Sequence, residues 1–174
     1  MKDALLRFFL PCAAVCLSAC VGLRPLRTPS GSPEIVVHAA PAHEILRELT
    51  AAMAQREYRL VMTNERVAVF QKPCEDFDTA FFYGKGWHAS ADFRATAFLS
   101  EESSGVKVLV DLEVVTDPGS PDEARRSAPV GHPEAHAIQK LLGGVVADLA
   151  LRRHEELWPD EPARPAEPRV WTGS

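Results

Sequence analysis

Apolar and polar residues alternate along two neighbouring stretches in the middle of the chain. In residues 105–116, valine or leucine fills every even position from 106 to 114, and residues 89–100 follow the same period of two. That period is typical of strands with one buried face, so we predict an antiparallel hairpin. Pairing Ser100 with Gly105 brings the apolar positions together and sets Arg94 opposite Asp111. Shorter apolar runs predict further strands at 34–39, 58–63 and 66–72.

Two other stretches have the helical period. Apolar side chains recur three and four positions apart in residues 41–57, and the same spacing runs through 133–158. The stripe predicted to be buried on the second helix consists of Ile138, Leu141, Leu142, Val145, Val146 and Leu149. Gly143 and Gly144 interrupt this helix, and the facing strand carries alanines at 91, 95 and 97. Either the helix lies unusually close to the sheet, or a cavity remains there for an apolar ligand.

The predicted elements follow the order β-α-β-β-β-β-α. This order indicates an α+β domain over residues 34–158, with an antiparallel sheet of about five strands and two helices packed on one face. Residues 117–132 are rich in turn-forming residues and are predicted as a loop. In element order the domain resembles helix-grip folds, which include START-like lipid binders. That resemblance implies a carrier of a small apolar ligand as one candidate function.

A charged and then apolar segment precedes the domain. Lys2 and Arg7 come before an apolar run over residues 8–19, which contains Pro11 and is too short for a bilayer-spanning helix of about 20 residues. This pattern predicts a signal peptide over residues 1–19. An ordinary secretory signal, cut at a nearby small residue, and an uncleaved anchor are the alternatives.

The apolar run ends in Leu17-Ser18-Ala19-Cys20, which resembles the lipobox of bacterial lipoproteins. The resemblance implies that diacylglycerol is attached through the Cys20 thiol as a thioether, that cleavage follows before Cys20, and that the new amino group receives an acyl chain such as palmitate. Val21, rather than an aspartate, follows the cysteine. In Gram-negative lipoproteins this implies the outer membrane, with the domain facing the periplasm. Membrane lipid is therefore the first partner that the sequence implies.

Segments rich in proline lie on both sides of the domain. Residues 20–33 hold Cys20 and a tether with three prolines and two glycines, which is predicted to be flexible and to reach at most roughly 45 Å. In the tail, residues 159–174, prolines recur at every third position from 159 to 168. They share one face of a polyproline II helix, which favours either a docking strip or a disordered end that has no partner.

Composition and charge narrow the classes of function. Apolar residues make up 46% of the 174 residues, charged residues make up 25%, and the formal net charge is −5. These values are ordinary for one globular domain, and the negative charge argues against nucleic-acid binding. The sequence contains no phosphate loop and no nucleophile-elbow motif. We therefore predict a protein that is not an enzyme and that uses no cofactor.

Histidine and cysteine offer little further chemistry. His132 and His136 are four positions apart near a helix start, so they are either a metal-ligand pair or, as we predict, solvent-facing residues that bind no metal. Once the signal peptide is removed and Cys20 is acylated, only Cys74 remains, so no intramolecular disulfide can form. The Cys74 thiol is expected either to be buried as a small apolar group or to be exposed.

Aromatic residues gather between the two predicted hairpins. Five of the 13 aromatic residues of the chain lie within residues 77–87, namely Phe77, Phe81, Phe82, Tyr83 and Trp87. They form a candidate surface for a ligand or a partner, unless some of them complete the core. Together with an exposed sheet edge, they favour an accessory or structural role in the envelope through contacts with an envelope protein.

Overall fold

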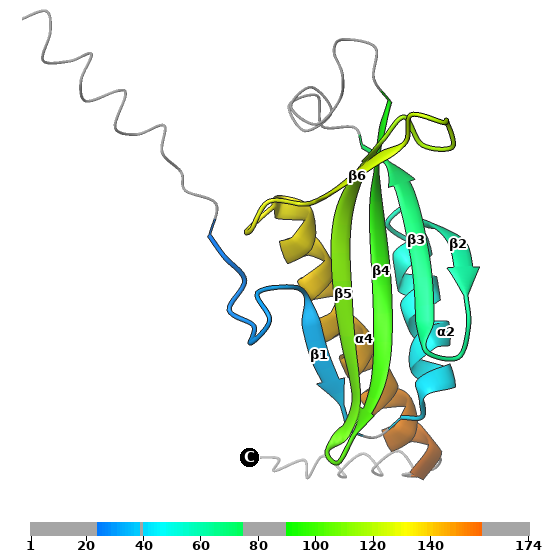
Figure 1. The fold of residues 1–174 in the computed structure, drawn as a ribbon. Coiled ribbons are helices and arrows are strands. Elements are labelled where there is room, and N and C mark those ends of the chain that lie inside the picture. Colours follow the sequence, from blue (N-terminus) through cyan, green and yellow to red (C-terminus); the bar gives the residue numbers. More distant parts are fainter. Residues whose placement is uncertain (1–23, 39, 75–89, 158–174) are drawn as a thin grey trace, which may run out of the picture.

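The computed structural model describes residues 24–38, 40–74 and 90–157, and within them it shows an α+β domain (Figure 1). The elements are β1 (Glu34–Val37), α2 (Ala42–Ala54), β2 (Arg59–Thr63), β3 (Val67–Pro73), β4 (Ala91–Glu102), β5 (Gly105–Thr116), β6 (Ala124–Ser127) and α4 (Pro133–Leu157). The strand order is β1-β5-β4-β3-β2, all neighbours are antiparallel, and β6 also pairs with β5. The predicted fold class is confirmed.

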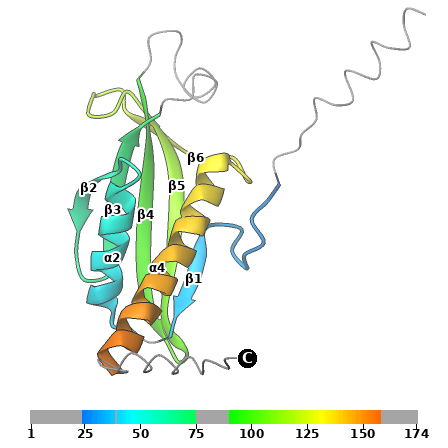
Figure 2. The same cartoon turned by 180° about the vertical axis from the view of Figure 1, so that it is seen from behind.

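Both helices cover the same face of the sheet. Figure 2 shows α2 and α4 in front of the strands, and Figure 1 shows the other face without a helix over it. The core lies between these layers. On α4, Ile138, Leu142, Val145 and Leu149 are buried, while Leu141 and Val146 are half-buried against the core. Within the described ranges, neither helix combines the length with the apolar character that a bilayer crossing requires.

Residues 124–127 form a strand in a region that the sequence predicted as a loop. β5 has 12 residues, but β1 pairs only with residues 106–109 of it. The remaining length of β5 therefore leaves an open edge, and β6 pairs there with residues 113–116. Because the sequence of β6 is Ala-Arg-Arg-Ser, it has no alternation that could predict a strand. Its conformation follows from the free edge beside it.

The β4–β5 hairpin has the predicted faces but a different register. Glu102 pairs with Gly105, and Arg94 lies opposite Glu113 rather than Asp111. The predicted pairing was therefore wrong by two residues. Because side chains alternate with a period of two, such a shift keeps every apolar residue on the same face. The hydrophobic pattern alone cannot distinguish the two registers.

The two glycines of α4 do not face the sheet. A Cβ atom built on Gly143 or Gly144 would meet no neighbouring atom within 4 Å, and both positions are exposed. The two explanations that the sequence suggested, a close approach of the glycines to the sheet and a ligand cavity between them and the sheet, are therefore both wrong, and Gly144 instead lines an open hollow between α2 and α4. Leu142 and Val145 belong to the buried stripe, and the two residues between them point away from it.

We expect Gly143→Ala and Gly144→Ala each to raise the free energy of unfolding by about 1 kcal/mol. The added methyl groups meet open space, and alanine leaves the unfolded backbone less freedom than glycine does. The midpoint of urea unfolding measures the effect. Gly105→Ala is the control, because Gly105 has a φ of +143° and its Cβ would overlap the Val37 carbonyl oxygen. That variant should be destabilised, and similar effects in all three variants would contradict this account.

Part of the predicted tether packs on the domain. Leu26 is buried within the core cluster, and the His136 Nε2–H donates to the Arg24 carbonyl oxygen at 2.7 Å. Further along, the Thr28 hydroxyl donates to the Ser32 carbonyl oxygen at 2.7 Å and closes a turn. A single apolar side chain among prolines gives no periodic signal, so this contact was not predicted. From Arg24 onward the segment is held against the domain.

Candidate functional site

The residues that the sequence singled out most strongly lie outside the described part of the chain. They are Cys20, Phe77, Phe81, Phe82, Tyr83 and Trp87. The structure places the two ends of the aromatic segment, since the Cys74 N–H donates to the Ala91 carbonyl oxygen at 2.8 Å and the Asp117 N–H donates to that of Ser90 at 2.9 Å. Both ends therefore lie where β3 ends and β4 begins. The Cys74 side chain is half-buried and packs against the core.

Ionisable side chains meet at the same end of the sheet, around Glu134 in the first turn of α4. Its Oε1 accepts a hydrogen bond from the Tyr58 hydroxyl at 3.2 Å and another from Lys72 Nζ at 2.9 Å. Arg56 Nη2 lies 3.8 Å from the same oxygen. Burial and the neighbouring carboxylate raise the pKa of Tyr58 above its ordinary value, so the hydroxyl remains a donor. A carboxylate in this turn also suits the helix dipole.

The Lys72 ammonium is held by three neighbours. Besides its ion pair with Glu134, it lies 4.8 Å from the ring centroid of Tyr58 and 5.9 Å from that of Phe93. A cleft of about 390 Å³ opens beside the pair, with Phe93 and His132 in its wall. Two cations, Lys72 and Arg56, thus lie within 4 Å of one carboxylate, that of Glu134. The ion pair between Lys72 and Glu134 links β3 to the start of α4.

The two histidines considered as a metal pair have separate structural roles. His132 is buried, and its Nδ1 accepts the backbone N–H of Glu134 at 3.1 Å, so it caps the start of α4. His136 instead binds the Arg24 carbonyl oxygen. The prediction that both face solvent was therefore wrong for His132. In the described ranges, no three His, Cys, Asp or Glu side chains are grouped so that they could hold a metal ion.

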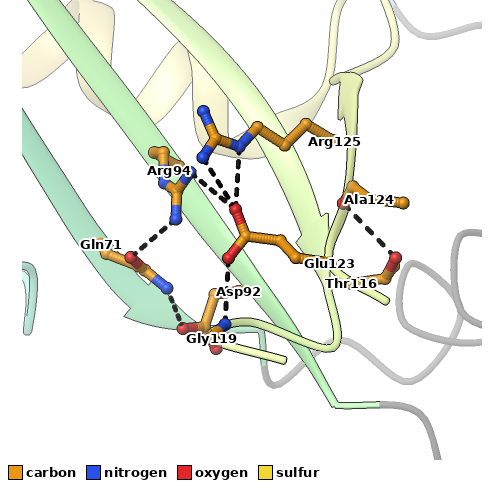
Figure 3. Close-up of polar contacts among 8 residues, drawn as sticks. All are labelled: Gln71, Asp92, Arg94, Thr116, Gly119, Glu123, Ala124 and Arg125. Atoms are coloured by element: carbon orange, nitrogen blue, oxygen red, sulfur yellow. Dashed lines mark hydrogen bonds and ion pairs between the residues drawn. The ribbon is translucent and has the colours of Figure 1, made fainter. Parts of the chain in front are cut away.

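A polar network crosses the sheet face that no helix covers (Figure 3). Glu123, in the loop before β6, lies at its centre. Its Oε1 accepts hydrogen bonds from Arg94 Nη1 at 3.2 Å and from Arg125 Nε at 2.9 Å. Its Oε2 accepts the Gly119 N–H at 3.0 Å. Arg94, which the predicted register set opposite Asp111, is thus bound instead by the carboxylate of Glu123, a loop residue.

Gln71 on β3 extends this network to a second carboxylate. Its Nε2 donates to Asp92 Oδ2 at 2.6 Å, and its Oε1 accepts from Arg94 Nη2 at 3.3 Å. Gln71 itself is buried although it lies on the face without helices. These bonds stabilise the junction of β3, β4 and β6, although the buried Nε of Arg94 has no hydrogen-bond partner among the described residues.

Glu123 is expected to make the stability of the fold depend on pH in acid. The Gly119 N–H, Arg125 and Arg94 together lower the pKa of this carboxyl to about 2, from a usual 4.5. Because the folded-state pKa is the lower one, the carboxylate stabilises the fold fully above about pH 4.5. That contribution is lost as the pH falls from 4.5 toward 2.

We therefore expect Glu123→Gln to lower the free energy of unfolding by about 2 kcal/mol at neutral pH. The difference from the parent protein should shrink as the pH approaches 2, where the parent carboxyl also becomes neutral. Thermal unfolding of both proteins across this range of pH measures it. A difference that stays constant with pH would show that the charge of Glu123 contributes nothing.

Apolar side chains gather elsewhere on the same face. The strand register pairs Phe98 with Val67 on one side and with Leu109 on the other, and it pairs Val69 with Met62. Phe98 is 43% exposed and Met62 is 53% exposed. Single exposed apolar residues are ordinary, but a contiguous group marks an interaction surface. We call these five residues the outer patch.

The outer patch reaches Met62 of β2, the terminal strand of the sheet on that side, whereas Leu60 pairs with the buried Phe70 and lies at the margin of the helix-covered face. Leu60 and Val61 are 42% and 51% exposed, and β2 pairs only with β3 among the described strands. A terminal strand presents backbone N–H and C=O groups along its free side. These groups can pair with an added strand, while pockets and apolar side chains on the sheet face supply specificity.

The opposite edge of the sheet is capped at one residue of β1. Gln139 of α4 accepts the Glu34 N–H at 2.8 Å and donates to the Glu34 carbonyl oxygen at 3.1 Å. Its side-chain amide thus takes the place of a neighbouring strand at Glu34. The Glu34 carboxylate in turn binds Lys107 Nζ at 3.2 Å. The backbone of β1 is therefore bound by α4 at Glu34, whereas β2 is exposed and apolar over residues 60–62.

The sequence predicted an exposed edge of the sheet but did not identify β2 as the strand that forms it. Residues 60–62 are three consecutive apolar residues, a pattern that also fits a strand buried on both faces. Glu134 and Gln139 gave no local signal, because their partners Lys72 and Glu34 are 62 and 105 positions away.

Comparison with protein-family models finds no family that matches this chain, and comparison with curated proteins finds no match either.

Proposed function

We propose that this protein is a lipid-anchored lipoprotein of the bacterial cell envelope, with a non-catalytic accessory or structural role. Acyl chains on Cys20 hold it to the membrane, and the domain faces the periplasm from the outer membrane. The lipobox resemblance of residues 17–20 supports the anchor. The open edge at β2 supports a role through contacts with an envelope protein.

The difference between the two sheet edges carries this proposal. Proteins normally protect a free edge with charge, proline, a bulge or a covering segment. β1 is protected in this way by Gln139. β2 has a bulge between Leu60 and Met62 and the charged Arg59 at its start, yet its three central residues are exposed and apolar, and Met62 belongs to the outer patch. Such an edge suits a partner that adds an extended, mainly apolar strand.

The cluster around Glu134 favours a role without catalysis. A general base or a nucleophile needs a position at which it can meet a reacting atom. Here Tyr58 and Lys72 both direct their polar atoms to Glu134. Of the two grounds for a lipid carrier, the resemblance in element order remains, but the second, two glycines facing the sheet, no longer applies, because Gly143 and Gly144 face away from it. We therefore put the accessory role before the carrier.

Site-specific photocrosslinking in cells tests the proposed edge. A photoreactive residue at Val61 or at Met62 should give a discrete adduct with one envelope protein. The same residue at Ala147, which is exposed on α4, should give none. Val61→Lys places a charge on the edge and should remove most of the adduct formed from Met62, without loss of folding.

Two results would count against this role. Equal adducts from Met62 in the parent and in Val61→Lys would mean that β2 does not bind a strand. A monomer that carries a tightly held apolar molecule and gives no adduct from β2 would favour the carrier instead.

A further inference from the structure

The described chain begins close to the proposed lipid anchor and is fixed to the domain from its first residues. Only residues 21–23 separate Cys20 from Arg24, so even a fully extended chain places their Cα atoms at most about 14 Å apart. The Arg24 carbonyl is bound by His136, and Leu26 is buried in the core. If Cys20 is acylated, the surface around Arg24 therefore lies next to the lipid.

This surface is built from three segments. Both Figure 1 and Figure 2 show the start of the described chain beside the loop that precedes α4. Residues 30–33 and 127–131 also line one shallow hollow of about 250 Å³, together with Asp111 and Leu112 of β5 and Ala135 at the start of α4. We call residues 24–33, 125–131 and 133–140 the anchor face.

The anchor face is basic although the whole chain has a net charge of −5. Arg24, Arg27, Arg126 and Lys140 are exposed, and none of them forms an ion pair with another described residue. Glu134, the one acidic residue within these three segments, is bound to Lys72, and the exposed Asp111 of β5 lines the hollow beside them. Val130 stands among these cations with 69% of its surface exposed. Cations around an exposed apolar side chain suit an anionic bilayer surface.

The far end of the domain carries charges of both signs. Glu101 and Glu102 lie at the β4–β5 turn, Glu155 and Glu156 lie in the last turn of α4, and all four are exposed, as are Arg152, which binds Glu48, and Arg153. Twenty residues of helix separate His136 from Glu156, which corresponds to about 30 Å. An anionic surface therefore attracts the end that carries the anchor more strongly than the mixed far end.

We propose that the anchor face rests on anionic phospholipid and holds the domain in one orientation on the membrane. This inference depends on the proposed anchor at Cys20. The same orientation also determines where the proposed partner surface lies. β1 and β6 border the anchor face, and β2 lies at the opposite edge of the sheet. The open edge at β2 then points away from the lipid, where an envelope protein can reach it.

Quenching of a fluorescent probe tests the orientation. The acylated full-length protein, in a Cys74→Ser background, is placed in vesicles of equal parts phosphatidylcholine and phosphatidylglycerol with a quencher on some headgroups. The probe is attached through Val130→Cys, and the matched control carries it through Ser103→Cys at the exposed β4–β5 turn. We expect quenching several-fold stronger at position 130 than at position 103.

A flexible linker separates the contribution of charge from that of the short connection. Twelve glycine and serine residues are inserted between Leu23 and Arg24, so that the chain no longer forces the face onto the lipid. Quenching at position 130 should then persist on the anionic vesicles and fall on pure phosphatidylcholine. Adding Arg24→Glu, Arg27→Glu and Arg126→Glu should remove it on the anionic vesicles as well.

The outcomes separate this inference from the anchor itself. If the protein floats with the vesicles but both probes are quenched equally, the orientation is overturned and the anchor stands. If the protein does not float with the vesicles, the anchor is overturned and the orientation with it. A photocrosslink from position 130 to a second copy or to another protein would also overturn the orientation.

Discussion

Replacing Glu134 with alanine is expected to lower the free energy of unfolding by about 3 kcal/mol. The carboxylate accepts hydrogen bonds from the Lys72 ammonium and from the Tyr58 hydroxyl, and the Lys72 side chain is only 16% exposed. Removal of the Glu134 carboxylate leaves the largely buried Lys72 ammonium and the buried Tyr58 hydroxyl without their hydrogen-bond acceptor. Chemical denaturation monitored by circular dichroism measures the loss.

Two further variants show whether the loss comes from this cluster. Glu156→Ala removes an exposed carboxylate from the same helix, so it should change stability by less than about 0.5 kcal/mol. Lys72→Met combined with Glu134→Ala removes both charges, and it should be less destabilising than the two single losses added together. Additive losses would mean that the ion pair between β3 and α4 contributes little.

The sequence predicted those parts of the fold that depend on local periodicity. The alternation in β4 and β5 identified which side chains face the helices, and the helical spacing identified most of the buried stripe on α4. The same period of two made the hairpin register ambiguous, because a shift by two residues exchanges no faces. What fixes the register is the tight turn, in which Gly105 approaches the Val37 carbonyl of a strand far away in the chain.

Some errors came from signals that were present in the sequence. Gly143 and Gly144 lie between Leu142 and Val145, both of which belong to the buried stripe. At 100° of rotation for each residue, which follows from 3.6 residues per turn, the positions between them turn away from that stripe. Paired glycines are rare in helices, which suggested a role in packing. Their positions between Leu142 and Val145 already indicated that they face solvent.

The candidate surfaces depend on contacts that no local pattern contains. Gln139 reads as an ordinary polar residue of a helix until its amide meets the backbone of β1. Leu26 reads as part of a flexible tether until it meets the core. Gln139 is 105 positions away from Glu34. His136, which binds the Arg24 carbonyl oxygen in the same segment as Leu26, is 112 positions away from Arg24. The exposed edge at β2 indicates a binding surface only when it is compared with β1, whose backbone is bound by Gln139 at Glu34.

The largest effect is expected from Cys20→Ser, which should abolish acylation and stable membrane attachment. A hydroxyl does not replace the thiol, which the lipobox resemblance implies is joined to diacylglycerol as a thioether. Each buried CH₂ contributes about 0.8 kcal/mol to membrane binding, so losing two or three acyl chains shifts the partition of the domain by many orders of magnitude. Metabolic labelling with a palmitate analogue and the intact mass of the protein measure the change together.

In the parent, the mass should lack residues 1–19 and include the acyl chains, whereas the serine variant should carry neither label nor added mass. Cys74→Ser is the matched control, because Cys74 belongs to the folded domain and its loss should leave the label in place. An uncleaved serine variant can remain in the membrane through its apolar N-terminus, so the label and the mass decide the question and fractionation alone does not. If the serine variant were processed and labelled like the parent, Cys20 would not be the acylated residue, and the short connection to Arg24 would no longer fix the domain against the lipid.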